Sequence, residues 1–395
     1  MSTSTSIGFS QHPDPKTAIL QACVHVKGQL STPHTDLIII FASPQYIIPE
    51  LQETVTRTLK PKLLIGSSSG GIILSNHVAN RGIAVIGINS DEMEFSVSAI
   101  SDLDAQDIKY AGFDLARNAI QNLHASHREA FITFSQGIEN NSSQFIRGIR
   151  EILGGAFPLI GALSSDHFKY KNTAQLFQDK ILHNSSVGLL VGGICKLGFG
   201  CAHNFKPLGM PRTITKVDGN IIRTIDNRPA VEIYEHFLGD HAQALNNLDL
   251  NPYTAVYPLG VYQEESGHYL LRNIIDILQD GSIVCHGGIP QGAEVHLMIS
   301  NTDSCINAAV QAAELAKMSL TDRQAKLILV IESIAHQKIL GRSMLGEIQA
   351  IKNVLGNNVP LAGMFSFGEI GPLGSQDNIK NIYLQNETIL VVAIA

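Results

Sequence analysis

The 395-residue sequence has no tryptophan, few charged side chains and no long apolar run. Charged residues make up 16 % of the chain and hydrophobic residues 44 %, which excludes a disordered chain or a coiled coil and favours large buried cores. The 28 Lys and Arg are outnumbered by 35 Asp and Glu and form no basic cluster, so we expect neither a nucleic-acid nor an anionic-membrane surface. The longest apolar runs, such as residues 37–42 and 327–331, are as long as strands, whereas a membrane span needs about 20 apolar residues. The first residues also lack the basic start and apolar core of a secretory signal, so we expect a cytoplasmic protein.

Cysteine is scarce and scattered, at Cys23, Cys195, Cys201, Cys285 and Cys305. An odd number of distant cysteines does not make a disulfide framework. The absence of C-x-x-C excludes a zinc ribbon, a thioredoxin-type pair and covalent haem attachment. We therefore expect small, buried, unpaired thiols.

One pattern of strand, helix, strand and second apolar strand occurs three times. Each copy begins with an apolar run, at residues 36–43, 130–135 and 326–332, and continues into a segment with helical periodicity. Near-continuous Ile, Val and Leu runs are typical of strands covered on both faces. The sequence therefore predicts an α/β fold of three strand–helix–strand–strand repeats in layered sheets. The apolar positions of the three helices are Leu51, Val55 and Leu59; Phe145, Ile149 and Ile152; and Met344, Ile348, Ile351 and Leu355.

The segment between the second and third repeats has a different pattern. Residues 213–225 predict a hairpin with Asp218-Gly219 at its turn, and Pro229 favours the first turn of a following helix. Four strands are predicted between residues 254 and 299, and a helix over 302–318 with Ile306, Val310 and Ala313 on one face. We expect an antiparallel β segment with a helix, and a division into domains 1–210 and 211–395 at a region rich in Pro and Gly.

A glycine closes the second strand of each repeat, and a serine follows three residues later. Glycine permits a close backbone approach, and ligands usually bind at the carboxyl ends of strands in open α/β sheets. The alternative is a tight turn whose serine bonds its own backbone. Arg272 interrupts an apolar strand, and a buried Arg needs a carboxylate or phosphate partner or several carbonyls, so it either anchors an anionic ligand or pairs internally. The candidate ligand-binding residues are Ser67, Ser68, Ser69, Gly70, Gly71, Arg272, Ser366, Gly368 and Glu369.

Residues 66–70 also match G-x-S-x-G, the nucleophile elbow of serine hydrolases. An elbow must open a helix, whereas the following residues are β-branched and soon reach another strand. The central Ser68 is matched by Leu163 and Phe365 in the other repeats. A serine hydrolase is therefore the weakest of the alternatives, and no catalytic residue is predicted.

Fifteen histidines show no metal-binding spacing. A single neutral imidazole in an apolar pocket can nevertheless hold haem b, and His203 lies beside aromatic residues near the predicted domain boundary. His286 and His296, on predicted strands, are second choices. For each of the three, an ordinary buried histidine is the alternative.

The repeat corners, together with residues 361–372 and 384–392, strongly resemble the FIST family, a sensory module with an N-terminal and a C-terminal FIST domain. The resemblance extends over nearly the whole chain, including residues 41–43, 66–70, 214–220, 226–231 and 269–272. It implies an intracellular sensor of small metabolites such as amino acids, and a separate partner to receive the signal. The family's usual cysteine-containing run is replaced here by residues 331–337.

Stand-alone FIST proteins of this size are similar to the haem-binding nitric oxide sensors of the NosP type. That resemblance implies a haem-based nitric oxide sensor that regulates a separate histidine kinase in a two-component system, with His203 as the iron ligand. The alternative is a FIST sensor of a small metabolite that uses the serine–glycine corner, Arg272 and Glu369. A homo-oligomer is compatible with either, because antiparallel edge strands can pair between subunits.

Overall fold

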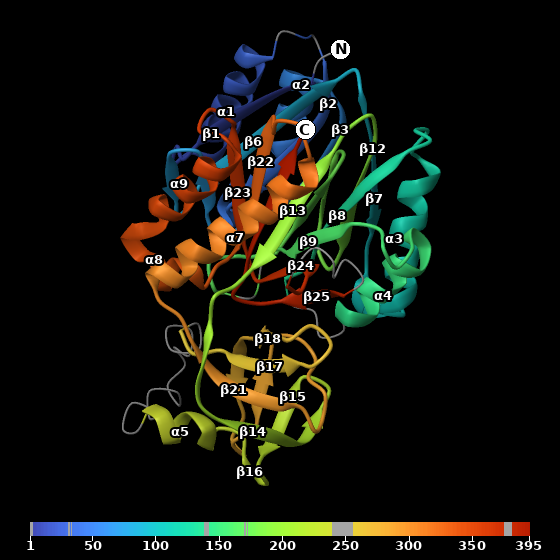
Figure 1. Ribbon diagram of the computed structural model, residues 1–395. Coiled ribbons are helices and arrows are strands. Elements are labelled where there is room, and N and C mark those ends of the chain that lie inside the picture. Colours follow the sequence, from blue (N-terminus) through green and yellow to red (C-terminus); the bar gives the residue numbers. More distant parts are fainter. Residues whose placement is uncertain are drawn as a thin grey trace.

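The computed structural model describes residues 3–30, 32, 34–137, 142–169, 171, 173–238, 256–374 and 381–395. Over these residues the chain forms a large body of three six-stranded sheets and a small antiparallel β body next to one end of it (Figure 1). The predicted α/β class is confirmed. None of the described helices is long and apolar enough to cross a membrane. The five cysteines are all buried and free, as predicted.

The large body contains the same order of elements three times. In each copy, the predicted strand–helix–strand unit forms the middle part. The first copy comprises β1 (Thr3–Ser10), α1 (Pro15–Gln29), β2 (Thr35–Ala42), α2 (Glu50–Leu59), β3 (Pro61–Ser68), β4 (Ile72–Leu74), β5 (His77–Ala79) and β6 (Ile83–Ser90). The second comprises β7 (Met93–Ile100), α3 (Ile108–Gln121), β8 (Arg128–Ser135), α4 (Ser142–Leu153), β9 (Leu159–Leu163), β10 (Gln175–Phe177), β11 (Lys180–Leu182) and β12 (Ser186–Gly193). The third comprises β13 (Leu197–Ala202), α7 (Thr302–Leu320), β22 (Leu327–Ser333), α8 (His336–Leu340), α9 (Met344–Leu355), β23 (Leu361–Ser366), β24 (Gly368–Pro372), β25 (Ile382–Gln385) and β26 (Ile389–Ile394).

Each repeat lends a β-hairpin to the sheet of another repeat. The first sheet has the order β1-β6-β2-β3-β10-β11, the second β25-β24-β9-β8-β12-β7, and the third β13-β26-β22-β23-β4-β5. The hairpin of the second repeat thus extends the first sheet, that of the third extends the second, and that of the first extends the third. This cyclic exchange joins the three repeats into one body, because no sheet is complete without a neighbour.

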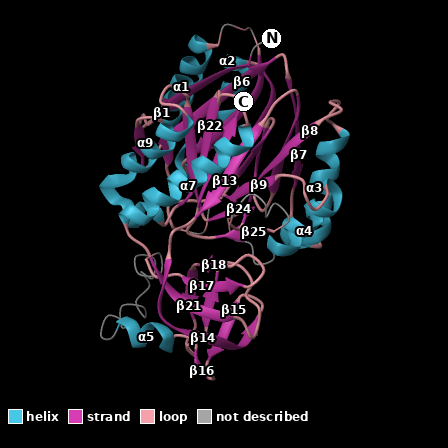
Figure 2. Cartoon of the chain, viewed as in Figure 1, coloured by secondary structure: helices cyan, strands magenta, loops and turns pink. Residues whose placement is uncertain are grey.

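The three sheets bury both of their faces. Along β2, Ile39 and Phe41 point into a central core shared by all three sheets, whereas Ile38 and Ile40 pack beneath α1 and α2. The ring of Phe41 meets that of Phe134, from the second sheet, edge to face at 5.6 Å. Figure 2 shows the helices on the outside of the strand layers. Burial on both faces explains the continuous apolar runs of these strands.

Helix α7 packs through small residues rather than through the predicted Ile306, Val310 and Ala313 face. Its buried positions are mainly alanines, while Ile306 and Val310 are only half-buried. A Cβ at Gly198 of β13 would lie 1.9 Å from the Ala316 carbonyl oxygen, so strand and helix approach too closely for larger side chains. The predicted helical period was right, but the buried side of this helix was only partly so.

The small body is an insertion between β13 and α7, and its antiparallel β architecture is as predicted. The Asp218-Gly219 hairpin is present, with Asp218 opposite Ile221. The predicted helix start at Pro229 is wrong: Pro229 belongs to a short strand, and the helix begins at Glu232. Residue 210, where the domains were predicted to divide, falls within β14. The elements are β14 (Lys206–Asp218), β15 (Ile221–Ile225), β16 (Arg228–Pro229), α5 (Glu232–Leu238), β17 (Leu259–Gln263), β18 (His268–Arg272), β19 (Ile274–Ile277), β20 (Ile283–Cys285) and β21 (Glu294–Ile299).

Candidate functional site

The glycine–serine corners of the three repeats meet in the interior. Strands β3, β9 and β23 each run parallel to the first strand of the repeat core, and their carboxyl ends converge. The hydroxyls of Ser67 and Ser164 lie 2.7 Å apart. Ser165 accepts a hydrogen bond of 2.8 Å from the Gly70 N–H and donates to the Phe365 carbonyl. One hydroxyl of the second repeat therefore joins the corners of the first and the third.

The corner serines are fully buried and bonded within the protein. The Ser69 hydroxyl accepts from the Phe365 N–H at 3.0 Å and donates to the Phe365 carbonyl at 3.2 Å. Ser68 accepts from the Ala174 N–H at 3.1 Å and is followed, after Gly70 and Gly71, by strand β4 rather than by a helix. The segment is thus not a strand-to-helix elbow. Ligand binding by residues 67–71 stays a prediction.

Glu369 is buried on β24 and held by donors of its own repeat. Its carboxylate accepts hydrogen bonds from the hydroxyl of Ser366 and, at 2.7 Å, from that of Thr388. Burial raises the pKa of Glu369 to about 7 against the opposing effect of these hydrogen bonds. Gly368, beside it, lies where a Cβ would come within 2.8 Å of the Leu384 side chain.

Arg272 ends β18 in the small body and reaches the large one. Its Nη1 donates to the carbonyls of Leu271 and Leu384 at 3.0 and 2.9 Å, and its Nε donates to Gly288 at 3.3 Å. Within the part of the chain that the structure describes, no carboxylate pairs with this guanidinium. Burial lowers the pKa of Arg272 to about 10, so the group still carries its charge at neutral pH. The structure thus gives Arg272 several carbonyl partners, one of the arrangements that the sequence allowed, and ligand binding by Arg272 stays a prediction.

A cavity of about 490 Å³ lies beside Arg272, bordered by α4 and β25. Arg147, Arg150 and Glu151 of α4 also border it, together with Tyr383. Arg147 pairs with Glu151 at 3.4 Å, and Arg150 donates to the Gly155 carbonyl at 2.8 Å. The cavity wall thus carries three guanidinium groups and one carboxylate, which gives it a net positive charge. Figure 1 shows α4, β25 and β18 at the junction of the two bodies.

His203 is a half-buried residue with a neutral imidazole, one nitrogen of which has no partner among the described residues. Its Nε2 bonds the Tyr269 carbonyl at 2.8 Å, and its Nδ1 has no hydrogen-bond partner among the described residues. Burial lowers the pKa of His203 to about 4. Metal-ligating histidines commonly show this arrangement, with one nitrogen donating to a carbonyl and the other free. His203 thus fits a ligand of haem iron, although it does not border the Arg272 cavity.

The two second-choice histidines lie apart from each other. His296 bonds Glu294 through Nε2 at 3.2 Å, and its ring meets that of Tyr269 at 5.4 Å. His286 lies 3.4 Å from the Asn386 side chain, and burial, with the nearby Arg272 charge, lowers its pKa to about 4. The structure therefore brings His203 and His296 to one residue, Tyr269, and His286 to the junction with β25.

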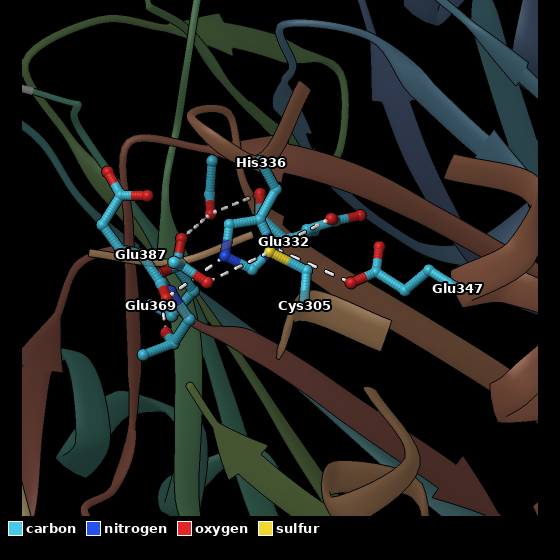
Figure 3. Close-up of polar contacts among 9 residues, drawn as sticks. Cys305, Glu332, His336, Glu347, Glu369 and Glu387 are labelled. Carbon is cyan, nitrogen blue, oxygen red and sulfur yellow. Dashed lines mark hydrogen bonds and ion pairs between the residues drawn. The ribbon is translucent and has the colours of Figure 1, made fainter. Parts of the chain in front are cut away.

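Sequence reasoning missed a buried group of ionisable side chains in the third repeat (Figure 3). Glu332 is the next-to-last residue of β22, His336 begins α8, and Glu347 lies in the first turn of α9. His336 Nδ1 is 3.1 Å from Glu332 Oε1 and 3.8 Å from Glu347 Oε1. The sequence does indicate this group: Glu347 lies between Met344 and Ile351 on the apolar face of the predicted helix, and an acid is rarely buried there unless it is paired.

The protonation of this group reflects its burial. Burial and the neighbouring Glu332 raise the pKa of Glu347 well above its usual range. Burial alone favours neutral His336, but its interactions with Cys305, Glu332 and Glu347 outweigh burial and raise the pKa of His336. Both shifts favour the protonated forms of Glu347 and His336.

The FIST N domain model matches residues 36–228, and the FIST C domain model matches residues 230–372. An uncharacterized protein of Mycobacterium tuberculosis is 21 % identical over 389 residues, covering 94 % of this chain and 95 % of its own. One of Mycobacterium bovis is 22 % identical over 399 residues, with the same coverage. One of Methanocaldococcus jannaschii is 21 % identical over 310 residues, and the match spans 72 % of this chain but only 57 % of the methanogen protein. Among solved structures, a cyanuric acid hydrolase from A. caulinodans aligns over 100 % of this chain and 99 % of its own, with 8 % identity and a TM-score of 0.42, too low to bear on function.

Proposed function

The chain belongs to the FIST family, whose domains are generally small-ligand sensors, and we propose that it is a sensor without catalytic activity that binds a small carboxylate metabolite in the Arg272 cavity. An amino acid or a dicarboxylate has suitable chemistry. The observation that carries the proposal is the buried guanidinium of Arg272, which is satisfied only by carbonyl oxygens. Buried charges are costly unless paired, and a planar guanidinium matches a carboxylate in two parallel hydrogen bonds.

The cavity supports the same conclusion. Its volume of about 490 Å³ lies in the usual range for small-molecule sites, and apolar residues such as Ile146 and Ile382 line it beside the three arginines. The described residues offer Arg272 Nη2 no hydrogen-bond partner, which leaves it to a ligand. Arg147 and Arg150, which also line the cavity, add positive charge, so an anion is favoured over a cation.

Thermal unfolding in the presence of L-glutamate, succinate and acetate, with L-glutamine as the less anionic counterpart of L-glutamate, tests the proposal. A bound carboxylate stabilises the folded state by RT ln(1 + [L]/Kd), about 2.7 kcal/mol at one hundred times Kd, so the unfolding temperature should rise and saturate. Arg272→Lys keeps the charge but loses the planar fork, and should weaken binding at least tenfold. Arg223→Lys, on an exposed pair with Asp218, is the matched control and should bind as the wild type does. No saturable carboxylate effect, or equal binding by Arg272→Lys, would contradict the proposal.

A second candidate is the haem-based nitric oxide sensor, and the unpartnered Nδ1 of neutral His203 is the observation that favours it. Haem bound there would supply an iron site for a diatomic gas, and a separate cytoplasmic histidine kinase would receive the signal. Titration with haem b should give one equivalent with a Soret band that His203→Ala shifts or removes. His286→Ala is the matched control and should leave the band unchanged. A band that survives in His203→Ala assigns the iron elsewhere and contradicts this candidate.

A further inference from the structure

Glu332, His336 and Glu347 place three ligand-type atoms close together in the interior. His336 Nδ1 and one carboxylate oxygen from each glutamate all lie within 4.8 Å of one another. All three side chains are at most 2 % exposed. They come from three successive elements, β22, α8 and α9, so the end of one strand and the starts of two helices position them.

Glu347 shows that the group is incomplete. Neither of its carboxylate oxygens has a hydrogen-bond partner among the described residues. An unpartnered buried carboxylate is strongly disfavoured, and such groups usually pair, neutralise or coordinate a metal. The carboxylate nevertheless points toward His336, with Oε1 3.8 Å from Nδ1, as Figure 3 shows.

The imidazole is oriented as a metal ligand would be. Its Nε2 lies 3.2 Å from the Glu387 carbonyl, to which only an N–H can donate. When a metal ion displaces the Nδ1 proton, that bond keeps the remaining proton on Nε2 and turns the lone pair of Nδ1 toward the two carboxylates. A partner on the far nitrogen is the usual second-shell support of a ligating histidine. The backbone of Glu332 is held as well, since Ser366 donates to its carbonyl at 3.2 Å.

We propose that Glu332, His336 and Glu347 form a buried binding site for one divalent transition-metal ion of the manganese, iron or zinc class. Ligand atoms about 2.1 Å from a common ion are separated by about 3–3.5 Å. His336 Nδ1 and Glu332 Oε1 already meet this separation at 3.1 Å, whereas Glu347 Oε1, 3.8 Å from Nδ1, must move inward. One imidazole with two carboxylates suits these ions better than soft, thiolate-preferring ones or the all-oxygen Ca²⁺. The ion replaces the protons that otherwise neutralise the group.

The site ties together three elements of the third repeat at the end where the corners meet. It is separate from the Arg272 cavity, whose lining includes none of the three residues. A metal there stabilises the fold next to the Ser366 corner whether or not the cavity binds a carboxylate. The two proposals therefore succeed or fail independently.

Elemental analysis of the full-length protein, purified without chelator from medium containing Mn²⁺, Fe²⁺ and Zn²⁺, tests this site. About one equivalent of a single metal per chain is expected. After chelation under mild denaturant and refolding, adding Mn²⁺ or Zn²⁺ should restore one equivalent and raise the unfolding temperature. Burial of the site means that exchange in the native protein is slow, so the refolding step matters.

Glu347→Gln is the decisive variant, because its side chain has the same shape and no existing bond to lose. It should fold, as judged by circular dichroism, and bind the metal at least 100-fold more weakly. Glu129→Gln makes the same change at a buried carboxylate on β8, in another sheet, and should keep one equivalent. Glu332→Gln serves as a second variant if Glu347→Gln does not fold. The proposal is overturned if the wild type holds no stoichiometric metal, or if Glu347→Gln and Glu332→Gln both keep the full metal content. Either result leaves a proton-sharing group of two acids and a histidine.

Discussion

Replacing Ser165 by alanine should weaken the contact among all three repeats. The Ser165 hydroxyl accepts from the Gly70 N–H and donates to the Phe365 carbonyl, so one substitution removes two hydrogen bonds. A neutral buried hydrogen bond contributes about 1 kcal/mol. The Phe365 carbonyl keeps the Ser69 hydroxyl at 3.2 Å and the Gly70 N–H at 3.4 Å, so no group is left wholly unpaired. We therefore expect a loss of about 2 kcal/mol.

Differential scanning calorimetry measures this loss. An unfolding entropy of about 2.1 cal/mol/K per residue gives about 0.8 kcal/mol/K for the 395-residue chain, so 2 kcal/mol lowers the unfolding temperature by about 2 °C. Ser96→Ala is the matched control, because its buried hydroxyl makes one bond of 2.7 Å to the Ala119 carbonyl within the second repeat. It should lose about half as much. An unchanged unfolding temperature in Ser165→Ala, beside a lower one in Ser96→Ala, would refute the idea that the corners hold the repeats together.

Three further predictions concern packing and pH. Gly148→Ala should destabilise by about 2 kcal/mol in chemical denaturation, because its Cβ would lie 1.9 Å from the Lys109 carbonyl oxygen where α3 crosses α4; an unchanged midpoint would contradict it. Gly28 is also helical, but a Cβ there would meet nothing within 4 Å, so Gly28→Ala should stabilise the folded protein by about 0.5–1 kcal/mol. A loss of stability would contradict this expectation. His286 has a folded pKa of about 4, below its unfolded value, so the unfolded state binds the proton first and stability falls from pH 6.5 to 4. His286→Gln should remove up to about 3 kcal/mol of that fall, and an identical pH profile would contradict the assignment.

Local sequence patterns predicted the repeats because the strand, helix and strand of each repeat follow one another in a short stretch of chain. The apolar stripe Leu51, Val55 and Leu59 lies on the buried side of α2, as expected, and the strands before and after it pair in parallel. The hairpin exchange has no such signature. Strand β4 is only three residues long, and its partner, β23, lies in the third repeat, so neither period nor spacing reveals the pairing.

The candidate site was predicted where one residue type contradicts its surroundings. Arg272 in an apolar strand signalled a buried charge, and the structure buries it as expected. Glu347 is likewise a charged residue among apolar ones, but the apolar positions around it indicate only a buried helix face and not which residues the acid meets. The cavity itself depends on α4 and β25, which belong to different repeats, and no sequence pattern joins them.

Arg272 connects the proposed ligand to a change that a partner protein can detect. The guanidinium links the small body to the large one through the Leu384 carbonyl of β25, and the neighbouring Asn273 N–H donates to the Asn386 side chain at 3.2 Å. A carboxylate on Nη2 would be bound by the same guanidinium that holds the Leu384 carbonyl through Nη1. Binding therefore alters the contact between the two bodies rather than either core. If the cavity binds the proposed carboxylate, the position of the small body is the change that we expect, and its surface is where a partner should be sought.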